Sequence, residues 1–382
     1  MTAPTLTRID AHVFRVPIAQ PVRTSFGTMT ERTAVFVRAE DSDGARGWGE
    51  VWCNFPNAAA EHRARLLADI VAPLALGRSL DDPTALWAEI DRALHVLRIQ
   101  SGDAGGFSAA AAGLDLAIHD LRARKRGLPL WRALGGRDDG PVPVYASGIN
   151  PGQAAFDTVE RCRAAGHRAF KLKIGFGEET DLGSLHLVAT ALRGSERLMV
   201  DANQAWDLAT ACRFVPRLAA FGLGWIEEPL MADRPTAEWT QVAANAPAPL
   251  AVGENLRGAG QYQMAIDSGL FGIVQPDVAK WGGHSGCLPV ARAALAAGRT
   301  FCPHFLGGAI GLMHSLHLLA AVRGPGLLEV DANPNPLREG LLGDLFEVGD
   351  GLVSLPGGQG LGLEPDLAVL VAFRSLHLEC RL

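Results

Sequence analysis

The chain has 382 residues, of which 48% are hydrophobic and 20% are charged, and it carries a formal net charge of −6. This length exceeds what one compact core usually supports, so the sequence predicts two domains. A modest negative charge without a concentrated basic surface excludes nucleic acid as an expected partner.

Targeting signals and membrane segments are not predicted. The first ten residues lack the basic flank and apolar core of a signal peptide. Six scattered cysteines without a Cys-x-x-Cys pair indicate neither a disulfide framework nor a zinc site. The longest apolar stretch, residues 305–322, contains histidines and glycines and fits a buried helix better than a membrane span. We therefore expect a cytoplasmic protein with no membrane partner.

The first third of the chain predicts an α+β unit. Residues 8–16 and 33–39 are rich in β-forming side chains, and the Asp-Ser-Asp-Gly sequence at 41–44 is typical of a turn. From about residue 58 to 134 the sequence becomes rich in Ala and Leu, which favours helices. We expect a capping domain over residues 1–135.

From residue 136 onward, short apolar strands alternate with helical segments. Eight such repeats predict an α/β fold with a modified (β/α)8 TIM barrel over residues 136–350. No Gly-x-Gly-x-x-Gly follows a strand, which argues against a doubly wound sheet. We expect the C-terminal segment, residues 351–382, to pack back on the capping domain and complete it. The predicted strands are 142–146, 169–174, 198–201, 224–227, 250–254, 272–275, 300–303 and 327–330.

Ionisable residues stand at the carboxyl ends of most of these strands. In a barrel the carboxyl ends converge on one mouth, where active sites are found. Because a buried charge is costly unless it is paired or binds a metal, so regular a series indicates a site. In chain order the residues are Lys171 and Lys173, Asp201 with Asn203, Glu227 with Glu228, Glu254, Asp277, His304 and Glu329.

Three of these acids form a candidate metal site. Asp201, Glu227 and Glu254 come from adjacent strands and offer hard oxygen ligands, which Mg²⁺ prefers and Mn²⁺ accepts. No Cys or His joins them, which argues against zinc. The alternative is three surface acids placed at helix N-termini, where the helix dipole favours them.

The remaining charges form candidate acid/base groups. Lys171 and Lys173 are two residues apart and therefore point to the same side of their strand. A nearby cation and the neighbouring ammonium are expected to lower a lysine pKa and free the amine as a base. Asp277 and His304, on adjacent strands, form a candidate pair in which the carboxylate orients the imidazole. A histidine packed after Pro303 is the alternative.

The ordered motifs K-L-K, V-D-A-N, I-E-E-P-L, V-G-E-N and Q-P-D-V-x-x-x-G-G resemble those of the enolase superfamily, and within it the mandelate racemase group. Residues 120–136 and the late L-P-G-G-Q-G-L-G segment are similar too, so the resemblance covers nearly the whole chain. It implies that Asp201, Glu227 and Glu254 hold the metal. Lys173 is then the base on one substrate face, and Lys171 helps to hold the substrate carboxylate and tunes Lys173. Asp277 and His304 form the dyad on the other face, and Glu329 is a carboxylic acid that hydrogen-bonds the substrate carboxylate.

The resemblance also implies the chemistry. The substrate is expected to be a small carboxylate whose α-proton is removed through an enediolate, with Mg²⁺ and hydrogen-bond donors stabilising the charge. We expect dehydration of an aldonate or aldarate to a 2-keto-3-deoxy acid. Racemisation or epimerisation of a 2-hydroxy acid uses the same bases, and a catalytically silent metal- and ligand-binding homologue is the third possibility. A lysine at position 277 would have indicated the muconate cycloisomerase group. The resemblance implies a homo-oligomer, either a dimer or an octamer.

Substrate choice in this family comes from cap loops, here residues 24–28 and 52–56. Ser25 and Asn54 are the candidate substrate contacts in them, and Asn203 and Glu228 are candidates beside the metal. His284 stands where an aliphatic residue is more usual, and we expect it to change a helix start or to add a polar group near the site.

Overall fold

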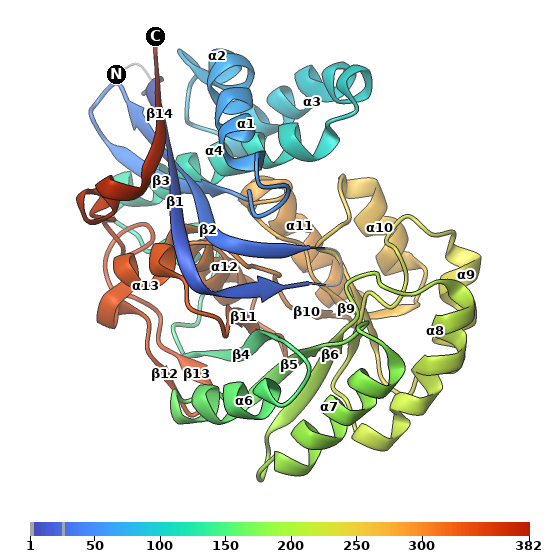
Figure 1. The fold of residues 1–382 in the computed structure, drawn as a ribbon. Helices are drawn as coiled ribbons and strands as arrows, with labels where there is room; N and C mark the ends of the chain where they lie inside the picture. Colours follow the sequence, from blue (N-terminus) through green and yellow to red (C-terminus); the bar gives the residue numbers. More distant parts are fainter. Residues whose placement is uncertain (1–3, 25–26) are drawn as a thin grey trace.

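The protein combines a (β/α)8 barrel with a smaller α+β unit, the cap, to which both ends of the chain contribute (Figure 1). The computed structural model describes residues 4–24 and 27–382. No helix in these two ranges is both long and apolar enough to cross a bilayer.

The cap is a four-stranded antiparallel sheet in the order β14-β1-β2-β3, covered on one face by helices. The last strand pairs with the first, from Arg8 opposite Arg381 to Phe14 opposite Arg374. The strands are β1 (Leu6–Arg23), β2 (Thr28–Asp41), β3 (Arg46–Val51) and β14 (Arg374–Arg381); the helices are α1 (Ala59–Leu66), the π-helical turn η1 (Leu67–Val71), α2 (Ala72–Ala75), α3 (Pro83–Ser101) and α4 (Ala104–Lys125).

The cap sheet has two buried faces because its side chains alternate between two cores. Val35 and Val37 of β2 pack with the cap helices, whereas Ala34 and Phe36 pack with residues of the barrel. Period-two alternation of apolar residues on both faces is what a strand between two apolar layers requires. The cap is thereby attached to the barrel through a continuous apolar contact.

Strand β3 approaches helix α4 closely enough that only glycine fits between them. A Cβ built on Gly49 would lie 2.1 Å from the Gly113 carbonyl oxygen and 2.7 Å from the Ala117 nitrogen. Both are backbone atoms, so the contact cannot be relieved by a side-chain rotation. The glycine is needed here for close approach and not for its conformational freedom.

We expect Gly49→Ala to destabilise the protein by about 1–3 kcal/mol, because the added methyl group forces β3 and α4 apart. Gly183→Ala is the matched control, since this exposed glycine lies inside a helix with nothing within 4 Å of an added Cβ. The control is expected to gain up to about 1 kcal/mol from helix propensity. Urea unfolding of both variants tests the expectation, and equal stability of Gly49→Ala and wild type would contradict it.

The barrel consists of eight parallel strands, each followed by a helix. Hydrogen-bonded pairing runs from β11 through β4, β5, β6, β7, β8 and β9 to β10, and no ladder joins β10 to β11 in the part of the chain described. The strands are β4 (Val142–Ile149), β5 (Ala169–Lys173), β6 (Arg197–Asp201), β7 (Ile226–Glu227), β8 (Leu250–Val252), β9 (Phe271–Val274), β10 (Thr300–Phe301) and β11 (Leu328–Asp331).

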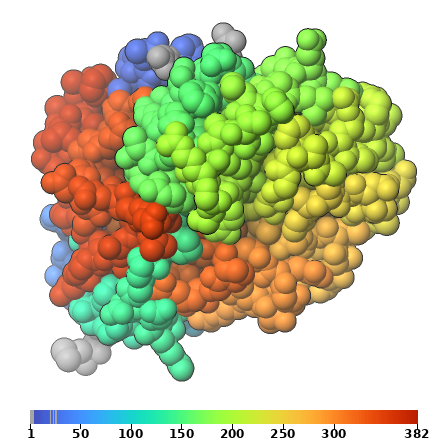
Figure 2. All heavy atoms as spheres, turned by 90° about the horizontal axis from the view of Figure 1, so that it is seen from below, coloured from blue at the N-terminus to red at the C-terminus, as the bar shows by residue number. Residues whose placement is uncertain are grey.

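The helices cover the outside of the strands, and in the view from below the repeats follow one another in sequence order from green through yellow to orange (Figure 2). All eight predicted strands are present, and their ends differ from the predicted ones by a few residues. The helices are α6 (Ala154–Ala164), α7 (Glu178–Ala191), α8 (Leu208–Phe214) continued by the 3-10 turn η2 (Val215–Phe221), α9 (Thr236–Ala243), α10 (Ala259–Asp267), α11 (Gly283–Ala296), α12 (Ala309–Val322) and α13 (Pro336–Leu342).

The tail does not leave the barrel at residue 351. Leu352 and Val353 form β13, which pairs with the start of β4. The chain then returns to the cap, where the Leu361 N–H donates to Asp120, Glu364 pairs with Arg124, and β14 joins the sheet. The short elements not yet named are α5 (Leu130–Ala133), the 3-10 turns η3 (Gly343–Leu345) and η4 (Leu367–Phe373), and β12 (Val348–Gly349), which pairs with β13.

One buried carboxylate joins the cap to a helix of the barrel. Glu50, in β3, is 2% exposed, and its two oxygens accept the N–H groups of Gly308 at 2.6 Å and Gly311 at 2.8 Å, at the start of α12. Burial raises the pKa of Glu50 to about 7 and the Asp277 charge acts in the same direction, while the two N–H groups oppose the shift. A helix N-terminus is a favourable place for an anion, and here it receives one from the other domain.

The raised pKa of Glu50 predicts a pH-dependent stability. The folded pKa of about 7 lies above the reference value of 4.5, so this contribution is fully present below pH 4.5 and is lost as the pH rises through 7. Glu50→Gln cannot titrate, so wild type should lose up to about 3 kcal/mol relative to this variant between pH 4 and pH 8. Urea unfolding of both proteins at several pH values measures the difference. Parallel pH profiles of the two proteins would contradict the prediction.

Candidate active site

The site is the second of two side-chain layers inside the barrel. One residue from each of the eight strand segments forms an apolar layer, and the residue two positions further along faces inward again, nearer the carboxyl end. The apolar layer is Tyr145, Ala169, Met199, Trp225, Ala251, Ile273, Cys302 and Leu327, and the layer above it is Ser147, Lys171, Asp201, Glu227, Gly253, Gln275, His304 and Glu329. Alternation along the strands therefore stacks a charged layer on an apolar one.

Gly253 is the one position of this layer that has no side chain. Its φ of +151° and a hypothetical Cβ only 2.4 Å from the backbone of Gln275 both require glycine. The chain therefore turns after β8, and the next residue, Glu254, is brought to the cavity as the acid of that strand. This turn explains why β8 ends at Val252, earlier than predicted.

Lys171 lies at the centre of the charged layer. Its ammonium is 2.7 Å from Glu227, 2.8 Å from Glu329 and 3.8 Å from Asp201, and the residue is 1% exposed. Burial opposes the charged form, but the Glu227 and Glu329 carboxylates hold the pKa of Lys171 well above its ordinary value. The surrounding carboxylates therefore favour the charged form of Lys171.

Glu227 is fixed by donors from three sides. It accepts hydrogen bonds from Lys171, from the Trp225 indole at 3.1 Å and from the Gln275 amide at 2.9 Å. Burial, together with the Asp201 and Glu329 charges, raises the pKa of Glu227 to about 7, against the effect of Lys171. The neighbouring Glu329 has the opposite shift: burial would raise its pKa, but Lys171 and His304 hold it at about 2.

Lys173 bridges Asp201 and Asn203. Its ammonium is 2.6 Å from one oxygen of Asp201 and 2.6 Å from the Asn203 side-chain oxygen. Burial favours the neutral amine, but the Asp201 carboxylate outweighs it and the pKa of Lys173 is raised. The Lys171 ammonium lowers this pKa, as expected, but by less than Asp201 raises it. The effect expected from a metal cation stays a prediction.

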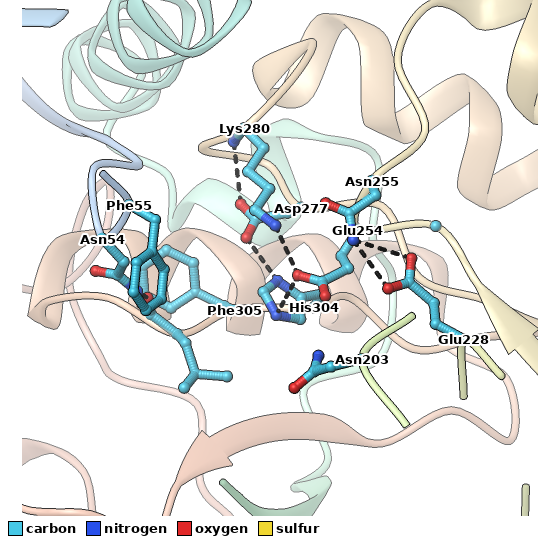
Figure 3. A network of polar contacts seen from close by, with 12 residues as sticks. Asn54, Phe55, Asn203, Glu228, Glu254, Asn255, Asp277, Lys280, His304 and Phe305 are labelled. Atoms are coloured by element: carbon cyan, nitrogen blue, oxygen red, sulfur yellow. Dashed lines mark hydrogen bonds and ion pairs between the residues drawn. The ribbon is translucent and has the colours of Figure 1, made fainter. Parts of the chain in front are cut away.

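The His304–Asp277 pair is assembled as the strand order predicts (Figure 3). The imidazole Nδ1 is 2.7 Å from one Asp277 oxygen, and the other oxygen accepts the N–H groups of Ala279 and Lys280. The imidazole Nε2 lies 3.0 Å from Glu254. Burial would lower the pKa of His304, but the Glu254 and Glu329 charges raise it to about 10. Both ring nitrogens face carboxylates, and this favours an acid/base role for His304 over the packed-histidine alternative.

Glu228 points to a different environment from Glu227. Its backbone has a φ of +40°, and its carboxylate accepts two hydrogen bonds from the Asn255 amide, at 2.9 and 3.1 Å (Figure 3). Burial and the Glu254 and Asp201 charges hold the pKa of Glu228 well above its ordinary value. This bend turns two consecutive acids toward different partners.

Lys280 is a further charged residue at the site that was not predicted from the sequence. This residue is 5% exposed, its ammonium is 2.6 Å from Glu254, and it lies 4.4 Å from the ring centroid of Trp52 in the cap. The signal was available in Q-P-D-V-A-K-W-G-G, where a lysine stands three residues after Asp277 on the loop at a strand end. A lysine only three residues from a predicted site residue is itself a candidate for the site.

A cavity of about 240 Å³ opens above these residues, between barrel and cap. The long β1–β2 hairpin reaches from the cap to this mouth (Figure 1) and contributes apolar walls. Lys173, Glu254, Lys280 and His304 line the cavity from the barrel, with Asn203, Gln204, Asn255 and Leu306, while Val22, Thr24, Met29, Trp52, Asn54 and Phe55 line it from the cap.

Three further predictions have mixed outcomes. Asn54 lines the cavity, and its amide donates to the Leu306 carbonyl at 2.5 Å. Ser25 lies outside the described residues. His284 stands at the start of α11, as the second residue of that helix, and does not line the cavity. Its Nε2 lies 2.8 Å from His314 Nδ1, and His314 contacts the Trp48 carbonyl, so the pair belongs to the contact between cap and barrel.

The donor set fits a hard divalent cation. Asp201, Glu227 and Glu254 bring carboxylates from adjacent strands to one end of the barrel, and oxygen is the donor that Mg²⁺ prefers. Each carboxylate contacts a buried ammonium at 2.6–2.7 Å, so a divalent ion would have to displace these ammonium groups from the carboxylates. Their oxygens do not all lie within 4.8 Å of one another, since each acid is turned to its own lysine.

A second group of possible ligands lies on the cap sheet. In the described ranges, Asp10, His12 and His377 offer ligand atoms within 4.8 Å of one another. However, the Asp10 oxygens already pair with Arg8 and Arg38, and two guanidinium groups repel a metal ion. We therefore assign no metal site there.

The fold and site together define an acid/base enzyme whose charges gather at the mouth of a barrel beneath a cap. Residues 8–135 match the N-terminal domain model of the mandelate racemase/muconate lactonizing enzyme family, and residues 154–369 match the enolase C-terminal domain-like model. The chain belongs to the enolase superfamily, and within it to the mandelate racemase/muconate lactonizing enzyme family.

Individual relatives are similar over nearly the whole chain. A mandelate racemase/muconate lactonizing enzyme structure from Bordetella bronchiseptica RB50 is 50% identical with a TM-score of 0.91, over 97% of this chain and 99% of that one. The D-galactarolactone cycloisomerase of Agrobacterium fabrum is 30% identical over 97% of this chain and 98% of that protein. An L-talarate/galactarate dehydratase mutant of Salmonella typhimurium LT2, solved with Mg and L-glucarate, is 27% identical with a TM-score of 0.87, over 100% of this chain and 94% of that one.

Proposed function

We propose that the protein is a Mg²⁺-dependent enzyme that removes the proton α to a substrate carboxylate, and that its reaction is the dehydration of a sugar acid. The observation that carries the proposal is that Lys173 and His304 line one cavity beside Glu254, although they come from strand segments well separated around the barrel wall. Two proton-transfer groups that approach one cavity from different strands suit chemistry on two faces of one carbon.

The metal ligands in this proposal are Asp201, Glu227 and Glu254, and Mn²⁺ is a possible substitute for Mg²⁺. A bound divalent cation supplies the charge that stabilises the enediolate formed when the α-proton leaves. The magnesium in the related dehydratase structure supports this assignment. In this proposal Lys171 helps to hold the substrate carboxylate and Glu329, once protonated, donates a hydrogen bond to it. Asn203 orients Lys173 through the hydrogen bond to its ammonium.

The two proton-transfer groups take different roles. Lys173 accepts the α-proton and must therefore be neutral. Positive charge on the carboxylates around it, such as a bound divalent cation would supply, lowers the pKa of Lys173 and so favours the neutral amine. His304 faces a carboxylate at each ring nitrogen, Asp277 at Nδ1 and Glu254 at Nε2, so it is suited to donate a proton to the departing β-hydroxyl group. An acid on one face and a base on the other is what elimination of water requires, and this favours dehydration.

Racemisation or epimerisation of a 2-hydroxy acid is the second candidate. It uses the same two groups but requires His304 to act as a base in one direction and as an acid in the other. The hydrogen bond from Nδ1 to Asp277 supports this role too, because it leaves Nε2 to exchange the proton.

The test is a panel of aldonic and aldaric acids incubated with the protein and Mg²⁺ in heavy water. Formation of a 2-keto-3-deoxy acid supports dehydration, whereas deuterium uptake with inversion and no keto acid supports racemisation. D-Galactarolactone belongs in the panel because of the related cycloisomerase. Absence of both keto acid and deuterium uptake across the panel would overturn the proposal in favour of a silent binding protein.

A further inference from the structure

Each proposed metal ligand is held by a lysine of its own. Lys171 contacts Glu227 at 2.7 Å and Lys173 contacts Asp201 at 2.6 Å. Lys280 contacts the third ligand, Glu254, at 2.6 Å. All six residues are less than 9% exposed, so the three ion pairs lie out of water, where each charge depends strongly on its partner.

Lys280 differs from the other two lysines in where it comes from. It is not on a strand but on the loop after β9, where Asp277 accepts its backbone N–H at 3.1 Å (Figure 3). The same loop contacts the cap, since the backbone N–H of Trp52 donates to the Ala279 carbonyl at 3.2 Å. The ammonium is therefore held at the boundary between the metal ligands and the cap.

The ammonium of Lys280 has a second partner besides Glu254. It lies 4.4 Å from the ring centroid of Trp52, which is within the range of a cation–π interaction. A buried cation deprived of its carboxylate is costly unless another group stabilises it. The indole face supplies such a group, so the carboxylate can be given up while the ammonium stays in place.

We propose that Lys280 is the counter-cation of Glu254: it holds this carboxylate when no divalent ion is bound, competes with a divalent ion for it, and remains on the face of Trp52 when the ion takes the carboxylate. The inference rests on the proposed function, because it takes Asp201, Glu227 and Glu254 as the metal ligands. It assigns to Lys280 a positioning role that sets metal affinity, and it makes Trp52 of the cap part of the metal equilibrium.

The two residues are expected to affect metal binding in opposite directions. Lys280→Met removes the competing charge, so its dissociation constant for Mg²⁺ should fall by about five- to tenfold. Trp52→Leu removes the indole face that stabilises the Lys280 ammonium when Glu254 is given up, so the dissociation constant should rise. In the double variant Trp52→Leu should have no further effect, because there is no ammonium left to stabilise. Calorimetric titration of the four apo-proteins, wild type included, with Mg²⁺ and with Mn²⁺ measures the dissociation constants.

Three controls separate this role from a purely structural one. Lys280→Arg keeps the charge and should bind Mg²⁺ as wild type does. Lys280→Gln lacks the charge but can still donate to Glu254, and it should show the tighter binding even if the methionine variant does not fold. Lys125→Met removes a lysine that pairs with Asp41 and Asp43 in the cap, and it should leave metal affinity unchanged.

The outcomes distinguish this inference from the proposed function. If wild type binds Mg²⁺ and Asp201→Asn does not, but Lys280→Met and Lys280→Gln bind Mg²⁺ no more tightly than wild type, Lys280 merely supports Glu254 and only this inference fails. If Asp201→Asn binds Mg²⁺ as tightly as wild type, the metal assignment fails and the inference fails with it. If Lys280→Met and Lys280→Gln bind Mg²⁺ more tightly than wild type, whereas Lys280→Arg binds it as wild type does, both the metal assignment and this inference are supported.

Discussion

Replacing Lys173 by Met is expected to lower turnover by about 10²–10⁴-fold, because this change removes the group that accepts the α-proton. Lys173→Arg should lose a similar amount, since a guanidinium keeps the positive charge beside Asp201 but does not release a proton at neutral pH. Steady-state kinetics on the acid identified from the substrate panel measures the loss. The same samples, followed by NMR in heavy water, should show no deuterium at the α-carbon.

Folding controls accompany this prediction. Both Lys173 variants should unfold cooperatively and should still bind Mg²⁺, since the proposed ligands are unchanged. Lys125→Met, which removes a cap ion pair far from the cavity, is the matched control and should keep wild-type turnover. Turnover of Lys173→Met within a few-fold of wild type would remove this residue from the mechanism.

Replacing His304 by Asn should also lower turnover by about 10²–10⁴-fold, but with a different signature. If dehydration is the reaction, Lys173 still removes the α-proton, so the recovered substrate should gain deuterium although no keto acid accumulates. Asp277→Asn should resemble this variant more weakly, because the imidazole remains and only its orientation and charge are changed. Time courses of deuterium uptake and keto-acid formation, recorded on the same samples, separate the two effects.

The opposite pattern would identify racemisation. In that case His304→Asn should exchange the α-proton of one enantiomer only, and inversion should stop. An His304 variant that forms product at the wild-type rate would contradict both reactions. His317→Asn is not a suitable control, because this histidine accepts the Trp131 N–H in the contact between helices α5 and α12. Lys125→Met is again the matched control for turnover.

Much of the fold could be predicted from sequence because its signals are local. Apolar segments of strand length alternate with helical runs, and each strand is followed directly by the helix that covers it. The strand ends were less predictable. The ladder stops at Val252 because Gly253 turns away with a φ of +151°, and no local pattern distinguishes that glycine from any other.

The site was predictable to the extent that it follows from alternation along strands. Lys171, Asp201 and Glu227 each stand two residues beyond an apolar residue of the inner layer, so they must face the same interior. The hydrogen bond between Asp277 and His304 follows from the adjacency of their strands. Lys280 was missed because it is on a loop, where no periodicity indicates the direction of a side chain.

By itself, the amino-acid sequence determined the barrel, the cap built from the first part of the chain, and the order in which acids and bases appear around the mouth. These features depend on periodicity along one segment. Only the tertiary structure decided which carboxylate each lysine holds, and that Glu228 turns to Asn255 while Glu227 faces Lys171. The physical reason is distance. Electrostatic shifts and hydrogen bonds depend on separations of a few ångströms between residues remote in the chain, and packing between barrel and cap sets those separations.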